Sequence, residues 1–361
     1  MRGNGMTYDT GFIHHGHTSR AAFEVDVVRR ELTIIRDDLH CNAVQITGGI
    51  PDRLELAAHC AAELGLEVWF SPYPLELEPA EISALFVDCA ARAERIRRST
   101  GVEVVFVAGV ELSIMNPGFV PGDTQPERLG HLLSGPEHRH VRFRETSARL
   151  NEFLRDAVAM IRETFHGKVT YCAIPFEQVD WTHFDIMSVE LIRSAAVADQ
   201  YQAGVRELVA SGMPVAITGF GTATYRNAGD GGGRAMEIAD YDEQTGAPIR
   251  LKAAYARDEA GQADYLREVL EIFEAEGVDS AFVFLFALET YPHRPDGDPL
   301  DDLDRASVGI VKTLDGDHGD TYPDMTWEPK VAFDAVAEHY RDGIDDAKKE
   351  RTRGLPGAAR H

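Results

Sequence analysis

Short apolar runs alternate with longer amphipathic stretches along most of the chain. The short runs predict eight strands, at residues 5–12, 43–47, 67–71, 102–110, 168–174, 184–189, 214–219 and 280–288. The amphipathic stretches predict helices at residues 24–39, 52–64, 80–98, 145–165, 202–211, 262–276 and 327–340. Strands that alternate with helices are typical of parallel sheets. Eight strands in one chain, most of them followed by a helix, predict an α/β fold, a single (β/α)8 TIM barrel.

The barrel is expected to form one domain over residues 1–344, since barrels of this class often exceed about 250 residues. The end of the chain, residues 345–361, is charged and then rich in Gly, Pro and Ala, and predicts a disordered or frayed tail. A connection at 116–139 that carries Pro, Gly and His predicts a lid or rim loop.

The net charge of the chain limits the classes of molecule that it is expected to bind. The formal net charge is -24, and such a field repels nucleic acid and anionic membranes, so a small neutral or cationic ligand fits better. The chain shows no apolar leader and no run of about 18 apolar residues, which predicts a cytoplasmic protein. The four cysteines form no C-x-x-C and are expected as buried free thiols. Nothing in the sequence sets the oligomeric state.

Carboxylates at the predicted strand ends are the candidate catalytic residues, because TIM-barrel active sites lie at the carboxyl ends of the strands. Glu111 ends the apolar run VEVVFVAGV, where an apolar wall would raise its pKa as a general acid requires. Glu289 is the preferred second carboxylate, and Glu190 is another candidate. A helix cap or an ion pair is the alternative for each.

Other residues near the strand ends are predicted to contact the substrate. They are Asp9, Gln45, Trp69, Tyr73, Glu177, Trp181, Asp185 and Tyr225. The aromatic members suit a stacking wall for a sugar ring, with core or rim packing as the alternative.

No cofactor and no metal are expected. The cluster His14, His15 and His17 has no carboxylate at helical spacing and is typical of an exposed loop. The alternative is a metal site of the kind found in barrel-fold sugar isomerases, built from Glu111, Glu289, Asp185 and His293.

Several segments, in order, resemble the clan A glycoside hydrolases, most of all the family 113 β-mannanase-type barrels. The stretch GVEL at 109–112 resembles the strand-four motif G-x-E-L. The stretch TYCAIPFEQVDWTHFDI at 170–186 resembles the passage from strand five to strand six. The stretches PVAITGFG at 214–221 and WEPKVAF at 327–333 resemble the strand-seven and closing motifs. The resemblance spans most of residues 5–340 and implies Glu111 as general acid/base.

The resemblance fails at one position that decides the mechanism. The family carries a nucleophilic Glu in T-E-[FI]-G where this chain has Gly219, and a retaining glycosidase needs two carboxyl groups about 5–5.5 Å apart. The expected function is therefore a glycoside-hydrolase-like enzyme that pairs Glu111 with a non-standard second carboxylate and is not a standard retaining glycosidase. An inverting reaction stays possible. The alternatives are an isomerase, lyase or cyclising enzyme on the same barrel, and a barrel that binds a carbohydrate-like ligand without catalysis.

Overall fold

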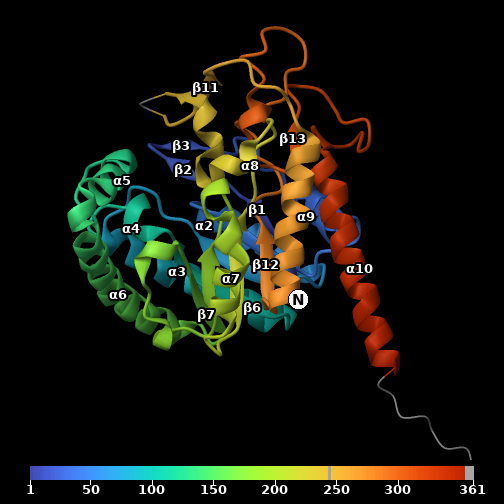
Figure 1. Ribbon diagram of the computed structural model, residues 1–361. Coiled ribbons are helices and arrows are strands. Elements are labelled where there is room, and N and C mark those ends of the chain that lie inside the picture. Colours follow the sequence, from blue (N-terminus) through green and yellow to red (C-terminus); the bar gives the residue numbers. More distant parts are fainter. Residues whose placement is uncertain (243–244, 354–361) are drawn as a thin grey trace, which may run out of the picture.

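Eight parallel strands close into a barrel in the computed structural model, which describes residues 1–242 and 245–353 (Figure 1). Around the barrel the order is β1 (Gly3–Asp9), β12 (Ser280–Val283), β9 (Val215–Phe220), β8 (Met187–Glu190), β7 (Lys168–Ala173), β6 (Val104–Val110), β5 (Glu67–Pro72) and β4 (Ala43–Gly48). Because β4 pairs with β1, the sheet closes on itself. The predicted TIM barrel is confirmed.

Helices surround the barrel on the outside (Figure 1). The long ones are α1 (Val25–Asp37), α2 (Pro51–Glu63), α3 (Pro79–Thr100), α6 (Arg139–Thr164), α7 (Ala198–Val209), α9 (Glu259–Glu276) and α10 (Val331–Arg353). Between β7 and β8, where the sequence predicted no helix, the described chain forms only the 3-10 turns η2 (Pro175–Glu177) and η3 (Trp181–His183). This connection contains Pro175 and runs directly to the start of β8.

The connections at the carboxyl ends of the strands build an upper lobe (Figure 1). It contains the hairpins β2–β3 (Ile13–His14, His17–Thr18), β10–β11 (Ala239–Tyr241, Pro248–Leu251) and β13–β14 (Val311–Thr313, Trp327–Pro329), with α8 (Ala228–Gly231). The predicted helix 327–340 is thus strand β14 at its start, and α10 begins only at Val331.

The predicted rim loop 116–139 is partly helical. It follows the short helix α4 (Leu112–Met115) and contains α5 (Gln125–Leu133). Thr124 and Glu127 form a capping box at the start of α5, in which each side chain accepts a hydrogen bond from the other residue's backbone N–H. Residues 345–353 of the predicted tail continue α10, and residues 354–361 lie outside the described residues. Within the described chain, no helix has the length and apolarity needed to cross a membrane.

An apolar plug fills the barrel interior below the carboxyl ends. Its members are Ala43, Trp69, Val105, Val107, Val110, Cys172, Ile186, Ala216 and Phe282. The Trp69 ring lies 4.6 Å from the Phe282 ring, centre to centre, and its Nε1 donates to Glu67 Oε1 at 2.9 Å. The plug closes the barrel, so a ligand can meet the carboxyl ends of the strands only from the side of the upper lobe.

Trp69 therefore belongs to the core. Trp69→Ala should lower the free energy of unfolding by about 3–5 kcal/mol, the usual cost of removing a buried aromatic side chain. Chemical denaturation measures this loss. Trp181→Ala, at a partly exposed ring, is the control and should cost much less. A Trp69→Ala protein with wild-type stability would contradict the plug.

Candidate functional site

Two unusual backbone positions aim Glu111 into the site. The pairing of β6 with β7 shifts register between Val107 and Val110, and within this irregularity Gly109 has a φ of 91°. A Cβ at Gly109 would lie 2.8 Å from Leu112 Cδ2, so both the conformation and the space require glycine. Glu111 itself adopts the left-handed region, with φ 46° and ψ 37°. The strand thus ends in a sharp turn at Glu111.

Glu190 ends β8 and lies opposite Gly219 of β9 in the strand register. A Cβ at Gly219 would lie 2.7 Å from Glu190 Cδ and 2.8 and 3.0 Å from its two carboxyl oxygens. The backbone at Gly219 is not left-handed, so glycine is needed here for space. The carboxyl group of Glu190 fills the volume that a side chain at position 219 would take.

Glu111 and Glu190 are joined by a side-chain hydrogen bond. Such a bond requires one proton between the two carboxyl groups. Burial, then the charge of Glu190 and the hydrogen bond, raise the pKa of Glu111 well above its usual range. Burial raises the pKa of Glu190 to about 7, although the hydrogen bond from Glu111 opposes this rise. Burial is thus the largest cause of the raised pKa of both carboxyl groups.

A third carboxyl group, Glu177, lies behind this pair and is fully buried. It accepts hydrogen bonds from Ser113 Oγ at 2.6 Å, Ser113 N at 3.2 Å, Tyr171 Oη at 2.8 Å and Ile174 N at 3.0 Å. Burial raises its pKa to about 7 against the opposing effect of these bonds. Every partner is part of the protein, so Glu177 differs from the substrate contact predicted from the sequence.

Tyr73, Cys172 and Gln45 surround the pair. The charges of Glu111 and Glu190, after burial, raise the pKa of Tyr73, and its ring meets Phe12 edge-on with centroids 5.0 Å apart. Gln45 is buried in the barrel, where its Nε2 donates to Ser71 Oγ at 3.2 Å and to Cys172 Sγ at 3.8 Å. Tyr73 and Gln45 thus lie close to the pair, with Gln45 below it in the barrel.

Asp9 and Glu289 form a second group around Arg20. Arg20 Nε lies 3.1 Å from Glu289 Oε1, and Arg20 Nη1 donates to the Asp9 carbonyl at 3.1 Å. Burial raises the pKa of Glu289 to about 7, with Arg20 opposing the rise. Strands β12 and β6 are four places apart in both directions around the barrel. Glu289, in the loop after β12, forms an ion pair with Arg20, and the carboxyl group next to Glu111 is that of Glu190 rather than of the preferred Glu289.

Three other predicted contacts lie away from the pair. Asp185 accepts from Arg162 Nη2 and from Val169 N, both at 2.8 Å, at the amino-terminal end of the barrel. Trp181 packs on Phe184, 5.6 Å away, in the same segment leading into β8. The ring of Tyr225 packs 5.2 Å from that of Tyr255 in the upper lobe. Asp185 and Trp181 both precede β8, which begins at Met187, so they lie at the amino-terminal end of this strand.

The alternative metal set is not assembled. His293 Nδ1 lies 2.9 Å from Asp302 Oδ1 in the upper lobe, while Glu111, Glu289 and Asp185 lie at three separate places. Across residues 1–242 and 245–353, no group of three or more His, Cys, Asp or Glu side chains could hold a metal ion. His14 and His15 stack edge-on in the β2–β3 hairpin.

The sequence interpretation missed Arg20 and Tyr171. Arg20 comes from the loop after β1, and its burial could not be read from the polar stretch HHGHTSR. Tyr171 lies within β7, where an aromatic residue in an apolar run indicates core. The hydroxyl group of Tyr171 accepts a hydrogen bond from the backbone of the turn after Glu111, and the sequence alone does not indicate this contact.

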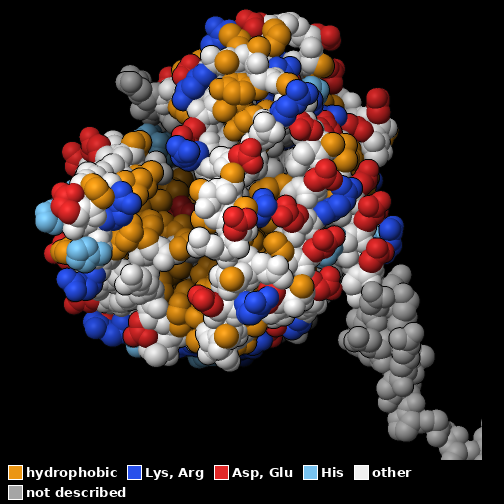
Figure 2. Space-filling model, viewed as in Figure 1, with side chains coloured by type: hydrophobic (Ala, Val, Ile, Leu, Met, Phe, Trp, Pro, Cys, Tyr) orange, Lys and Arg blue, Asp and Glu red, His pale blue; other side chains and the backbone are white. Residues whose placement is uncertain are grey.

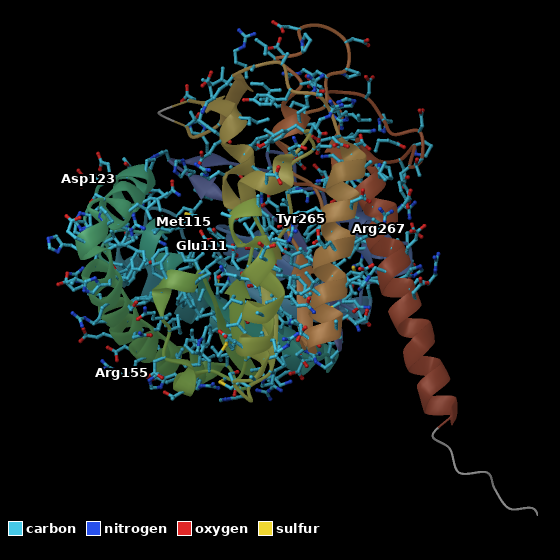
Figure 3. The ribbon with its side chains drawn as sticks, viewed as in Figure 1. Glu111, Met115, Asp123, Arg155, Tyr265 and Arg267 are labelled. Atoms are coloured by element: carbon cyan, nitrogen blue, oxygen red, sulfur yellow. The ribbon has the colours of Figure 1, made fainter. Side chains whose placement is uncertain are left out.

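The surface opens near the pair. Figure 2 shows a hollow bordered by hydrophobic side chains below the upper lobe, beside the segment of α4 and α5, and Figure 3 labels Glu111 in the same region. An acidic pair beside an apolar border is suited to a ligand that is partly apolar and can exchange protons.

Solved glycoside hydrolase structures share this fold. A GH113 β-1,4-mannanase has a TM-score of 0.55 and 16% identity, covering 94% of this chain and 98% of that one. The GH113 β-mannanase AaManA from Alicyclobacillus acidocaldarius, in complex with ManMIm, gives 0.56 and 16%, with 94% and 97% covered. Fungal β-1,4-galactanases give 0.52 and 11%, with 92% and 98% covered. No protein-family model and no curated protein sequence matches the chain. At such identities the similarity shows the fold alone.

The raised pKa of Glu190 makes stability depend on pH. In the unfolded chain this group loses its proton near 4.5, whereas the folded protein keeps it until about 7. Between these values the unfolded state binds fewer protons, so this group's contribution to stability falls as pH rises, by up to about 1.4 kcal/mol per pH unit.

The substitution Glu190→Gln removes this loss of stability at higher pH. The variant should gain stability relative to the wild type from about pH 5 to about pH 8, as measured by denaturant unfolding at both pH values. Glu145→Gln, at an exposed glutamate on α6, is the control and should show no such gain. A constant difference between Glu190→Gln and wild type across this range would show that Glu190 titrates normally.

Proposed function

We propose that the protein is a glycoside-hydrolase-like enzyme in which Glu111 is the general acid/base and Glu190 is the second carboxylate. The observation that carries the proposal is the position of the Glu190 carboxyl group, which lies over Gly219 and next to the carboxyl group of Glu111. Sequence resemblance aligns Gly219 with the nucleophilic Glu of family 113. Glu190, from the neighbouring strand, would supply the carboxylate that this position lacks.

The proton distribution in the pair supports these roles. A retaining glycosidase needs one protonated and one ionised carboxyl group. Environments that push two pKa values apart are the usual way to fix such roles, and here Glu111 keeps the proton. Direct contact also favours the short separation of retaining enzymes over the gap of about 6.5–9.5 Å that inverting enzymes use for water.

The proposed reaction has two displacements. In the first, a Glu190 oxygen bonds to the anomeric carbon while the glycosidic C–O bond breaks, and the leaving oxygen takes the proton of Glu111. In the second, Glu111 takes a proton from water, whose oxygen bonds to the anomeric carbon and releases Glu190 as carboxylate. The substrate enters between the two carboxyl groups and replaces their mutual hydrogen bond.

The substrate class follows from the charges. Among the described residues, the neighbours that shift the pKa values of Glu111, Glu177 and Glu190 are carboxyl groups, the hydroxyl groups of Ser113 and Tyr171 and the backbone of Ile174, with no lysine or arginine among them. A neutral glycoside suits this site better than an anionic one, and aryl β-glycosides of neutral sugars are the first substrates to assay.

Glu111→Gln tests the acid/base role. It keeps the shape of the side chain but carries no exchangeable acid proton, so kcat should fall by about 10²–10⁴-fold. The thermal melt should stay at or above that of the wild type, because no cation is stranded by the change. Steady-state kinetics on aryl glycosides and melts at the same pH give both values. Wild-type kcat in a folded Glu111→Gln protein would refute the role.

Glu190→Ala and Gly219→Ala test the second carboxylate. Glu190→Ala should abolish turnover, and azide, entering the vacated space, should rescue it as a glycosyl azide product. Gly219→Ala should lower kcat because its Cβ would lie 2.7 Å from Glu190 Cδ and displace the carboxyl group.

Gly204→Ala is the control for the glycine change, since a Cβ on this residue of α7 meets nothing within 4 Å. It should leave kcat unchanged. Turnover by Glu190→Ala without azide would exclude Glu190 as nucleophile. Ligand binding without turnover by the wild type on every glycoside would favour a barrel that only binds its ligand.

A further inference from the structure

The turn that presents Glu111 has a conformation that must be held in place. A residue other than glycine in the left-handed region costs about 1–2 kcal/mol, so the surroundings have to stabilise it. The turn's own bonds are those of Ile114 N and Met115 N to the Glu111 carbonyl, at 3.2 and 3.1 Å. These fix the start of α4 but leave the amides of Leu112 and Ser113 to other partners.

Tyr171 and Glu177 bind those two amides. Leu112 N donates to Tyr171 Oη at 2.8 Å, and Tyr171 Oη donates in turn to Glu177 Oε1 at 2.8 Å. Ser113 donates to the same oxygen through both its amide and its hydroxyl group. The residues immediately after Glu111 are therefore held by one buried carboxylate and one buried phenol.

We propose that Glu177 is a positioning residue, which with Tyr171 clamps the turn of residues 111–113 and so aims the Glu111 carboxyl group at Glu190. This role rests on the proposed function for its catalytic meaning, while the clamp itself is independent of any substrate. Glu177 is fully buried and both its oxygens are occupied by protein donors, so it cannot also bind a ligand.

The charge of Glu177 has a second effect on the pair. It raises the pKa of Glu190 and of Tyr73, and Glu111 in turn raises the pKa of Glu177. The titratable groups that face Glu177 are thus Glu111, Glu190, Tyr73 and Tyr171.

Helix α6, which packs on residues 175–178, contributes Phe143, Ser147 and Asn151, none of which carries a charge. An ionised Glu177 therefore helps to retain the proton shared by Glu111 and Glu190.

The variant Glu177→Gln distinguishes two roles of Glu177: positioning the turn and acting on the pair through its charge, or only stabilising the fold. The amide keeps an acceptor for Ser113 and Tyr171 but removes the charge, so the shared proton should leave the pair about 1 pH unit lower. The readout is a pH titration of ¹³C-carboxyl-labelled glutamate, with signals assigned from Glu111→Gln and Glu190→Gln. With an active glycoside, the alkaline limb of kcat/KM should move down by the same amount while KM stays constant.

Asp180→Asn is the matched control, at an exposed carboxylate on the same connection. It should move neither the titration nor the alkaline limb. A Glu177→Gln protein with a lower melting temperature and an unmoved titration would overturn the inference. A shifted titration without turnover of any glycoside would support the inference and count against the proposed function alone.

If Glu177→Gln does not fold, the variant Tyr171→Phe tests the clamp instead. It keeps the charge of Glu177 and removes the acceptor for Leu112 N, so kcat should fall about 10-fold through the loss of one buried hydrogen bond, with KM unchanged. For a protein without a known substrate, the readout is the carboxyl signal of Glu111, which should lose its hydrogen-bonded shift. An unchanged kcat or an unchanged Glu111 signal in Tyr171→Phe would overturn the clamp.

Discussion

Two carboxyl groups meet at the upper end of the barrel because residue 219 has no side chain. Glu190 and Gly219 are register partners on neighbouring strands, and the Glu190 carboxyl group lies within 3.0 Å of where a Cβ on residue 219 would stand. Glu111 reaches the same point from β6, through a turn in the left-handed region. The contact between Glu111 and Glu190 affects the pKa values of both groups and the space for a ligand. It is also the reason why the turn at Glu111 must be held in place.

Burial decides which forms of the carboxyl groups are stable. An apolar plug lies beneath them, and desolvation is the largest cause of the raised pKa values of Glu111, Glu177 and Glu190. Glu289 shows the contrast: it is also raised to about 7, but Arg20 lies beside it and opposes the rise. The pair at Glu111 has no such cation among the described residues that shift its pKa values, so no positive charge opposes the rise caused by burial.

The sequence predicted the barrel and Glu111 because both follow from local patterns. An apolar strand ending in a carboxylate is visible in VEVVFVAGV, and the start of α5 was readable from the spacing of Thr124 and Glu127, although it was predicted as a loop. The partner of Glu111 was not predictable in this way. Choosing Glu190 over Glu289 requires the strand order and the β8–β9 register. Asp185 precedes β8 and accepts hydrogen bonds from Arg162 and Val169, at the end of the barrel opposite the carboxyl ends of the strands.

Neighbouring strands lie about 4.8 Å apart, so register partners present their side chains to almost the same place. The Glu190 carboxyl group on β8 can lie over residue 219 of β9 only if that residue is glycine, because a Cβ there would lie 2.7 Å from Glu190 Cδ. The two positions are therefore mutually exclusive. In the proposed enzyme, a second carboxylate on β8 instead of β9 requires both Glu190 and Gly219. A glutamate introduced at position 219 would displace the Glu190 carboxyl group, so the site would not gain a third catalytic carboxylate. The geometry makes residue 219 a determinant of which strand supplies the carboxylate.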